Sequence, residues 1–333
     1  EETAYHYLTT VGEDGKADKT FFDAIGFTSR GSLSWMENRD DSYNWFLTEL
    51  FREGVNMNAM DAAQGRINKE KGTNVKAPAF ISVNCPVIGD TFHGKTVETA
   101  QDYIDCLKWM ADRAIEEFNA GDYQNIYLAG FYWQGEKLRP NHWSPDPAHD
   151  TEAAIAFNEY IHSLGYLSLW CPYYSYLNGI WHSHYYGFDV TCWQPNYMFK
   201  DDVPESRLYD NATYTKQLGL GVEIEADYGV TSNPAKREKY RDYLRVGVET
   251  GYMHSIKMYY QDSGVYYTAY KSTDPYYHSV YDETYLYAKG ILSYGLPELK
   301  ETTFTGEKDK QLVIFPKAAD GSNLDVDVAM HPK

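Results

Sequence analysis

Residues 125–136, Asn-Ile-Tyr-Leu-Ala-Gly-Phe-Tyr-Trp-Gln-Gly-Glu, form an apolar and aromatic run that ends in a single acid. No residue of Ile126–Trp133 is charged, and Gly121 and Gly135 frame the run. A strand buried on both faces has this continuous apolar pattern, which is typical of parallel sheets. Glu136 then follows the carboxyl end of the strand, where strand–helix proteins gather ligands and catalytic groups. The stretch predicts a buried parallel strand and a candidate functional glutamate, although a lone glutamate is more often a surface loop residue.

Length and composition indicate one large acidic protein. A chain of 333 residues with 43% hydrophobic content is typical of one large α/β domain with an appendage. The net charge of −18 and the pI near 4.9 argue against nucleic acid or an anionic membrane surface as a partner. No apolar run has transmembrane length. The chain starts at Glu1 without a signal-like segment, and we therefore expect a processed form of something longer.

Cysteines and aromatic residues carry two weaker indications. The four cysteines lie far apart without a CxxC spacing, which favours buried free thiols over a disulfide framework or a zinc site. The 32 Tyr, 14 Phe and 8 Trp make 16% of the chain. Tyr and Trp combine a broad apolar face with a polar group, so this content suits surfaces that bind sugars as well as it suits a large core.

Strands and helices alternate along most of the chain. The helical segments are expected at 41–52, 57–71, 96–118, 150–164, 204–218, 233–250 and 274–287. Seven strands are expected at 21–27, 78–85, 126–133, 166–173, 188–195, 220–226 and 253–261. This alternation predicts an α/β fold of the TIM (β/α)8 type. Because a barrel has eight strands, the first strand is missing from this chain or irregular, and the simplest interpretation puts it upstream of Glu1. Residues 1–298 would form the barrel domain, and 299–333 a C-terminal extension that begins a β-rich accessory module.

A second pair of acids lies in the seventh strand of this numbering, within Gly221-Val-Glu-Ile-Glu-Ala226. The period of two places Glu223 and Glu225 on one face and the apolar residues on the other. Apolar residues belong under the helices, so the glutamates are expected to point into the barrel, where carboxylates are costly unless they are hydrogen-bonded or catalytic. The alternative is a structural role in which Lys257 or an arginine pairs with them.

Five motifs carry a resemblance to a known family. They are 130–136 (Gly-Phe-Tyr-Trp-Gln-Gly-Glu), 193–197 (Trp-Gln-Pro-Asn-Tyr), 205–207 (Glu-Ser-Arg), 221–225 (Gly-Val-Glu-Ile-Glu) and 259–261 (Tyr-Tyr-Gln). Over about residues 5–292 the chain resembles a bacterial family catalogued as domain of unknown function 4855. That family is similar to TIM-barrel glycoside hydrolases with acids after strands four and seven, and its members have an additional amino-terminal strand. The resemblance implies the fold, a carbohydrate substrate such as a bacterial, host or plant polysaccharide or glycan, and a secreted, periplasmic or cell-surface location.

The chemistry expected from this resemblance is retaining glycoside hydrolysis without a metal or cofactor. Glu136 would be the acid/base and Glu225 the nucleophile, with carboxyl groups about 5–5.5 Å apart, or about 6.5–9.5 Å apart if water must fit between them. Glu223 would raise the pKa of its neighbours or hold the nucleophile, and Glu136 is expected to have the more apolar surroundings. The remaining candidates also have core or rim interpretations. Those expected to stack on sugar rings are Trp133, Trp193, Tyr197 and Tyr259, and those expected to bind hydroxyl groups are Gln194, Asn196, Lys257 and Gln261.

Two alternatives stay open at this stage. One is a barrel that binds a glycan without cleaving it. The other is a metal-dependent hydrolase that would use His142, His149, His182 and His184, although no HExxH helix is present. The sequence contains no phosphate-binding GxGxxG or GxxxxGK[ST] and no GxSxG nucleophile elbow. The identity of the sugar and the oligomeric state are not encoded in any of these patterns.

Overall fold

The computed structural model describes residues 1–29, 38–138, 149–262 and 264–294. The chain divides into two units, Glu1–Ile291 and Leu292–Lys333, and all helices and strands named below belong to the first. The expected extension at 299–333 lies outside the described residues. In the described part, no helix has both the length and the apolar character needed to cross a membrane.

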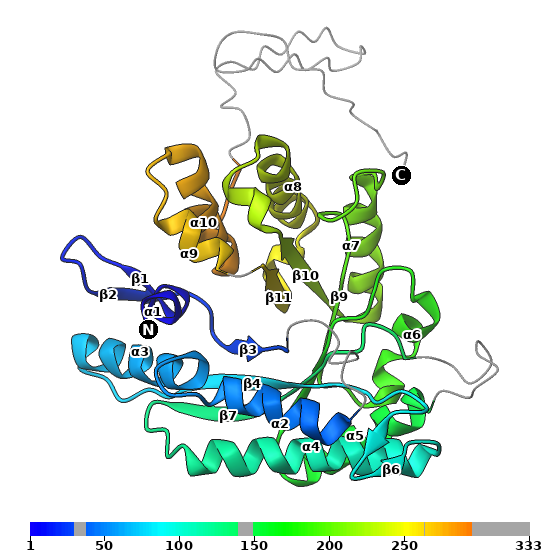
Figure 1. Ribbon diagram of the computed structural model, residues 1–333. Helices are drawn as coiled ribbons and strands as arrows, with labels where there is room; N and C mark the ends of the chain where they lie inside the picture. The colour runs from blue at the N-terminus through cyan, green and yellow to red at the C-terminus, as the bar shows by residue number, and fades with distance from the viewer. Residues whose placement is uncertain (30–37, 139–148, 263, 295–333) are drawn as a thin grey trace, which may run out of the picture. The chain divides into compact units, whose positions relative to one another are not determined.

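Seven parallel strands form the central sheet, and each corresponds to one of the seven expected strands. They are β3 (Ile25–Phe27), β4 (Ala77–Val83), β7 (Ile126–Trp133), β8 (Leu167–Trp170), β9 (Val190–Trp193), β10 (Gly221–Ala226) and β11 (Lys257–Gln261). Their order in the sheet is β11-β10-β9-β8-β7-β4-β3, so each strand pairs with its predecessor and successor along the chain. β3 and β11 are the two ends of this sheet. The predicted TIM-type architecture, one strand short of a closed barrel, is confirmed (Figure 1).

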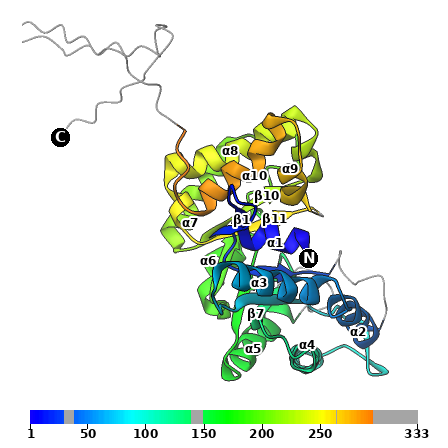
Figure 2. The ribbon, with the colours of Figure 1, turned by 90° about the vertical axis from the view of Figure 1, so that its left-hand side faces the viewer.

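Helices follow most strands and cover the outer side of the sheet (Figures 1 and 2). The long helices are α2 (Arg39–Leu50), α3 (Asn56–Lys71), α4 (Ala100–Ala120), α5 (Asp150–Ser163), α7 (Ser206–Leu218), α8 (Pro234–Thr250) and α10 (Pro275–Ala288). Their starts have identifiable causes. Thr99 and Asp102 form a reciprocal capping box at α4, and Asn233 and Asp274 cap α8 and α10 just before a proline.

Several short elements have no counterpart in the prediction. They are α1 (Glu2–Leu8), the hairpin of β1 (Thr9–Val11) and β2 (Ala17–Thr20), the hairpin of β5 (Thr91–Phe92) and β6 (Lys95–Thr96), α6 (Leu177–Trp181), α9 (Val265–Tyr270), and the 3₁₀ turns at Ser183–Tyr186, Tyr228–Thr231 and Tyr252–His254. Each spans two turns of helix or less, or a few strand residues, so it contains too few residues to show a period. Packing against longer elements stabilises them instead, as α1 shows by lying against α3.

The core between sheet and helices is strongly aromatic. Trp133 of β7 packs against Phe157 of α5 and against Phe188, with ring centroids 6.0 and 6.1 Å apart. Trp170 of β8 stacks on Phe188 at 5.0 Å. Trp133 and Trp170 are 1% and 0% exposed. Much of the aromatic content is therefore used for packing, as one of the two interpretations predicted.

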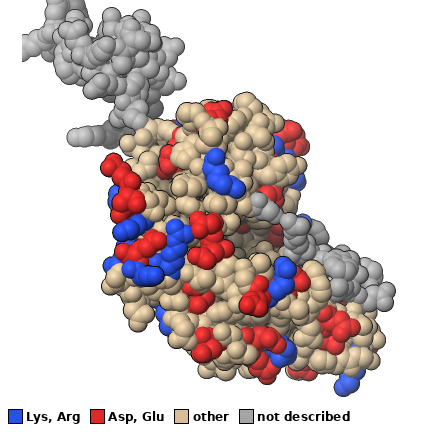
Figure 3. Space-filling view, turned by 60° about the vertical axis from the view of Figure 1, so that its left-hand side comes forward, with Lys and Arg blue, Asp and Glu red and all other residues tan. Residues whose placement is uncertain are grey.

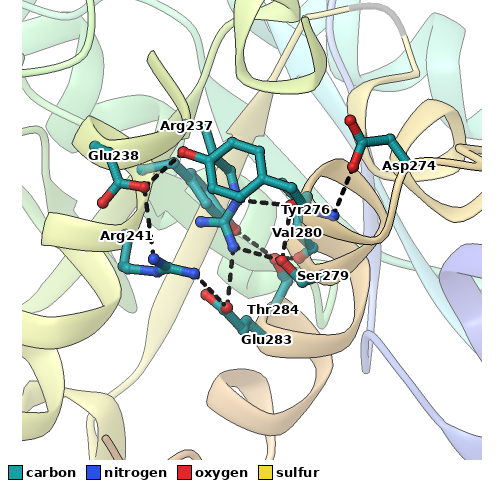
Figure 4. A network of polar contacts seen from close by, with 10 residues as sticks. Arg237, Glu238, Arg241, Asp274, Tyr276, Ser279, Val280, Glu283 and Thr284 are labelled. Carbon is teal, nitrogen blue, oxygen red and sulfur yellow. Dashed lines mark hydrogen bonds and ion pairs between the residues drawn. The ribbon is translucent and has the colours of Figure 1, made fainter. Parts of the chain in front are cut away.

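A buried arginine joins the last two long helices (Figure 4). Arg237 of α8 is completely buried, and its guanidinium donates to Ser279 at 2.8 Å and pairs with Glu283 of α10 at 2.9 Å. Arg241, one turn further along α8, contacts the same Glu283 oxygen at 3.1 Å. At the rim of the network, the Tyr276 hydroxyl donates to Glu238 at 2.6 Å. These contacts fix α8 against α10, and α8 in turn covers β10, which carries the acidic pair.

Candidate active site

A cavity of ≈ 1270 Å³ opens at the carboxyl ends of the strands. Its walls include Glu136, Glu223, Tyr132, Gln134, Gln194 and Tyr260. These residues come from β7, β10 and β11 or from the segments that directly follow β7 and β9. The cavity therefore lies where parallel strand–helix folds bind their ligands.

A second cavity, of ≈ 710 Å³, lies between the two ends of the sheet, with Ile25 of β3 and Lys257 of β11 among its lining residues. Five residues line both cavities: Thr28, Tyr132, Glu223, Tyr260 and Gln261. The interior of the sheet is thus reached from two sides. Figure 3 shows that one face of the molecule is hollowed, and that Lys and Arg side chains there are interspersed with Asp and Glu.

Glu136 follows β7 and is exposed to solvent. Its backbone carbonyl accepts a hydrogen bond from the Tyr173 amide at 2.9 Å, which fixes the end of β7 beside the segment after β8. The expectation that Glu136 has more apolar surroundings than the acids of β10 is wrong. The two glutamates of β10 are the buried ones, because they lie inside the sheet whereas Glu136 has passed its edge.

Glu223 is 7% exposed and projects into the interior of the sheet. Burial raises the pKa of this carboxyl well above its usual value, and the nearby charges of Glu225 and Glu136 raise it further. The thiol of Cys171 is a hydrogen-bond partner of Glu223 and acts in the opposite direction. Burial and the neighbouring carboxylates therefore favour the neutral form of Glu223.

Glu225 is 1% exposed, and its Oε2 atom accepts hydrogen bonds from the Tyr243 hydroxyl and from the Tyr197 amide, the latter at 3.2 Å. Burial raises the pKa of Glu225 to about 7, although these bonds and one from the Asn196 amide lower it. The carboxyl is thus partly ionised near neutral pH and held in one orientation. Neither cavity includes Glu225 in its walls, but its register partner on β11, Tyr260, lines both.

Two of the expected stacking residues lie on the wrong side of the sheet. Trp133 is part of the core beneath α5, as described above. Trp193 is 1% exposed and stacks on Tyr174 at 5.0 Å, with its edge toward Tyr214 of α7. In a strand, neighbouring side chains point to opposite faces, so a residue next to an inward-facing one faces the helices. Trp133 and Trp193 fill the core for this reason.

Asn196 and Tyr197 lie close to the acidic pair but contact it through their backbone. Both are at least nine-tenths buried. The Tyr197 side chain packs against Tyr243, and its hydroxyl donates to Asp242 of α8 at 2.9 Å. Neither side chain lines the two cavities, so their expected roles in sugar stacking and hydroxyl binding are not supported by their placement.

The other expected binding residues divide between the two cavities. Gln194 lines the larger one and donates to the Cys171 carbonyl at 3.0 Å. Gln261 lines both, and its side-chain oxygen accepts from the Tyr7 hydroxyl at 2.8 Å. Tyr259 and Lys257 line only the smaller one, and the Lys257 ammonium donates to the carbonyls of Met253 and Ser255 at 2.6 and 2.9 Å. Lys257 therefore neither pairs with the glutamates nor reaches the cavity that holds Glu136.

The residues of the larger cavity that the sequence prediction missed include Tyr132, Gln134 and Tyr260. Alternation along the strand identifies Gln134 and Tyr132, which are reached by counting back from Glu136 in steps of two. Tyr260 follows from the register, because it pairs with Glu225. Alternation along β7 and the residues after it therefore selects Gln134 and Tyr132 in place of Trp133, whereas the choice of Tyr260 depends on the pairing of β10 with β11.

Three of the four histidines considered for a metal site lie in the described residues, and each has its own surroundings. His149 lies 3.1 Å from Glu152, the His184 ring contacts the Leu218 carbonyl at 2.8 Å, and His182 is exposed. His142 lies outside the described residues. Within the described ranges, no three His, Cys, Asp or Glu side chains are grouped so that they could hold a metal ion.

The fold and the site together define an α/β protein with a parallel barrel-like sheet and a carboxylate cluster at its strand ends. Residues 1–286 match the family model described as domain of unknown function (DUF4855), and the chain belongs to that family. No curated protein matches its sequence.

Similar solved structures include several barrel enzymes. A GH18 chitinase from Pseudoalteromonas aurantia is 12% identical, with a TM-score of 0.42, over 78% of this chain and 99% of that one. A GH5-4 broad-specificity endoglucanase from an uncultured bacterium is 11% identical, with a TM-score of 0.41, over 81% and 94%. A 3-keto-D-glucoside 4-epimerase from E. coli is 15% identical, with a TM-score of 0.33, over 80% and 99%.

Proposed function

We propose that this protein is a retaining glycoside hydrolase that cleaves a polysaccharide or glycan in the larger cavity. The observation that carries the proposal is the set of three glutamates at the ends of β7 and β10. Glu136 faces solvent, and Glu223 and Glu225 are buried. Carboxyl groups that differ in exposure and in hydrogen bonding can take the two different parts, acid/base and nucleophile, that cleavage of a glycosidic bond requires.

Glu225 is the better nucleophile of the two β10 acids because a nucleophile must be ionised. Burial and the neighbouring carboxylates favour the neutral form of Glu223, and a neutral carboxylic acid cannot attack a carbon atom. Glu225 accepts several hydrogen bonds that favour its ionised form, and its pKa lies at about 7. The ionised fraction of Glu225 attacks the anomeric carbon and the glycosidic carbon–oxygen bond breaks.

Glu136 acts in both halves of this reaction. It protonates the departing oxygen in the first half, and in the second half it removes a proton from the water that breaks the glycosyl–enzyme bond. Its exposure suits the second half, because the water must enter beside it. In the first half, bound sugar excludes solvent from the cavity, so that Glu136 meets the glycosidic oxygen in place of water.

The larger cavity offers the groups by which proteins recognise sugars. Tyr132 and Tyr260 present aromatic rings, and the amides of Gln134 and Gln194 supply both donors and acceptors. Its volume of ≈ 1270 Å³ exceeds the usual size of a small-ligand pocket, which is about 300–1,000 Å³, so it suits an oligosaccharide segment.

Release of reducing sugar from a library of polysaccharides and glycans tests this proposal. We expect hydrolysis of at least one member by the unaltered protein, loss of hydrolysis in Glu136→Gln, and unchanged hydrolysis in Glu98→Gln, a change at an exposed glutamate that lines neither cavity. Binding of a glycan by the unaltered protein without any turnover would replace the proposal with a non-catalytic binding barrel.

A further inference from the structure

Tyr243 is a completely buried tyrosine in the middle of α8, outside the sheet, yet its hydroxyl reaches an acid of β10. The pairing of β9 with β10 ends at Trp193, and the chain after it leaves the sheet. At this point the Tyr243 oxygen contacts the backbone amides of Tyr197 and Met198, both at 3.1 Å, as well as Oε2 of Glu225. Three segments thus meet at one phenolic oxygen.

The direction of the hydroxyl proton follows from these partners. A backbone N–H can only donate, so the two amides of Tyr197 and Met198 occupy the acceptor positions of the phenolic oxygen. The proton of Tyr243 must then be donated to Glu225. Because this carboxylate oxygen is an acceptor, any proton that Glu225 takes up has to go to its other oxygen.

The backbone around Asn196 contributes to the same contact. Asn196 has a φ of +53°, in the left-handed region that asparagine tolerates better than most residues. Successive N–H groups can converge on an anion when the chain takes this conformation. Here the amides of Asn196 and Tyr197 bond Glu225, and the amide of Met198 bonds the tyrosine oxygen.

From this geometry we propose that Tyr243 is the positioning residue of Glu225: together with the amides of 196–198 it forms a latch that orients the carboxyl and favours its ionised form. The inference rests on the proposed function, in which Glu225 is the nucleophile. The latch offsets the influences that disfavour a negative charge on the Glu225 carboxyl. These are burial itself and the carboxyls of Glu223 on the same strand and Glu136 after β7. The titratable side chain opposite Glu225 on the adjacent strand is that of Tyr260 of β11.

Removal of the Tyr243 hydroxyl leaves the ring in the core and deletes the latch. The matched control is Tyr240→Phe, because Tyr240 is also completely buried on α8 and its hydroxyl bonds only Thr284 at 2.6 Å and Tyr266 at 3.3 Å among its described contacts. The pKa of Glu225 is read from the side-chain carboxyl carbons in ¹³C NMR titrations, with the resonance assigned by its absence in Glu225→Gln. We expect Tyr243→Phe to raise that pKa by about one unit or more, since a hydrogen bond to a charged group is lost.

In the enzyme, the acidic limb of the kcat/KM profile should shift to higher pH by the same amount, with no shift in Tyr240→Phe. An unchanged Glu225 pKa in folded Tyr243→Phe overturns the latch, even if the protein hydrolyses glycans. A raised pKa in a protein that cleaves no glycan supports the latch and refutes the proposed function, so the two failures are distinguishable. If Tyr243→Phe does not fold, the Glu225 carboxyl is titrated in Asn196→Ala instead, because alanine disfavours the left-handed backbone that directs the amides of 196–198. An unchanged Glu225 pKa in folded Asn196→Ala also overturns the latch.

Discussion

Glu225 of β10 and Tyr260 of β11 are register partners in adjacent parallel strands, so their side chains leave the same face of the sheet. Glu225 is 1% exposed and Tyr260 is 44% exposed, so the pair consists of a buried acid beside an accessible aromatic ring. A sugar unit whose anomeric carbon approaches Glu225 would therefore contact the Tyr260 ring.

Loss of the Tyr260 ring should weaken sugar binding. We expect Tyr260→Ala to raise KM by about tenfold, which corresponds to about 1.4 kcal/mol of lost contact, and Tyr260→Phe to change it little because the ring remains. Tyr185→Ala is the control, since Tyr185 is 72% exposed but lines neither cavity. Equal losses in Tyr260→Ala and Tyr260→Phe would show that the hydroxyl, and not the ring, makes the contact.

Trp133 should affect stability and not recognition. Because it is 1% exposed in the core beneath α5, Trp133→Ala is expected to lower the free energy of unfolding by about 3–5 kcal/mol, and Trp133→Phe by less. Urea unfolding measures both. A Trp133→Ala protein with unchanged stability and lost glycan binding would restore the original assignment of this residue to the sugar site.

The sequence predicted the fold better than the site for a physical reason. All seven strands and the long helices are repeated units with continuous apolar patterns or clear caps, such as Asn233 before Pro234. The count of seven strands also indicates that the barrel is one strand short of closure. Short elements such as α1 depend on tertiary packing, which no local pattern records.

At the site, the position of a residue along its strand is a better guide to its role than its residue type. Residue type predicts sugar stacking by the tryptophans at 133 and 193, but the alternation from Glu136 assigns the inward face to Gln134 and Tyr132. The burial of Glu225 beneath Tyr243 could not be foreseen, because the tyrosine comes from a helix that covers the other side of the sheet. Such contacts across layers leave no trace in the spacing of residues.

Glu283 should be essential for stability because it is the partner of a buried charge. Removal of its carboxylate by Glu283→Ala leaves Arg237 inside the protein without an ionic partner, at a cost of about 3–5 kcal/mol in unfolding free energy. The control Glu117→Ala removes an exposed partner of Arg113 and should cost about 1 kcal/mol or less. Similar midpoints for the two variants in urea unfolding would contradict the structural role of the Arg237 network.

The stability of the protein should depend on pH through Glu225. Burial raises the pKa of Glu225 from 4.5 to about 7 in the folded state, so the contribution of this group is fully present below about pH 4.5 and is lost as the pH rises through about 7. In Glu225→Gln this loss is absent. We therefore expect the Tm of the variant to increase relative to that of the unaltered protein across this window. A Tm difference that is constant with pH would mean that the folded and unfolded pKa values of Glu225 are the same.

The separate roles of the glutamates can be resolved with two substrates that differ only in their leaving group. An aryl glycoside with an acidic phenol needs no proton on the departing oxygen, whereas a natural glycoside does. Glu136→Gln should therefore lose about 10²–10⁴-fold in glycosylation rate on the natural linkage and much less on the activated one.

Glu225→Gln should lose activity on both substrates, because no nucleophile remains. Both variants should keep nearly unchanged glycan binding and stability near neutral pH. Glu223→Gln should retain most of the activity, since burial favours the neutral form of Glu223 and the neutral amide replaces that form. The assignment would be wrong if Glu223→Gln lost turnover on both substrates while Glu225→Gln stayed active. Glu223, the β10 acid that lines the cavity, would then be the nucleophile.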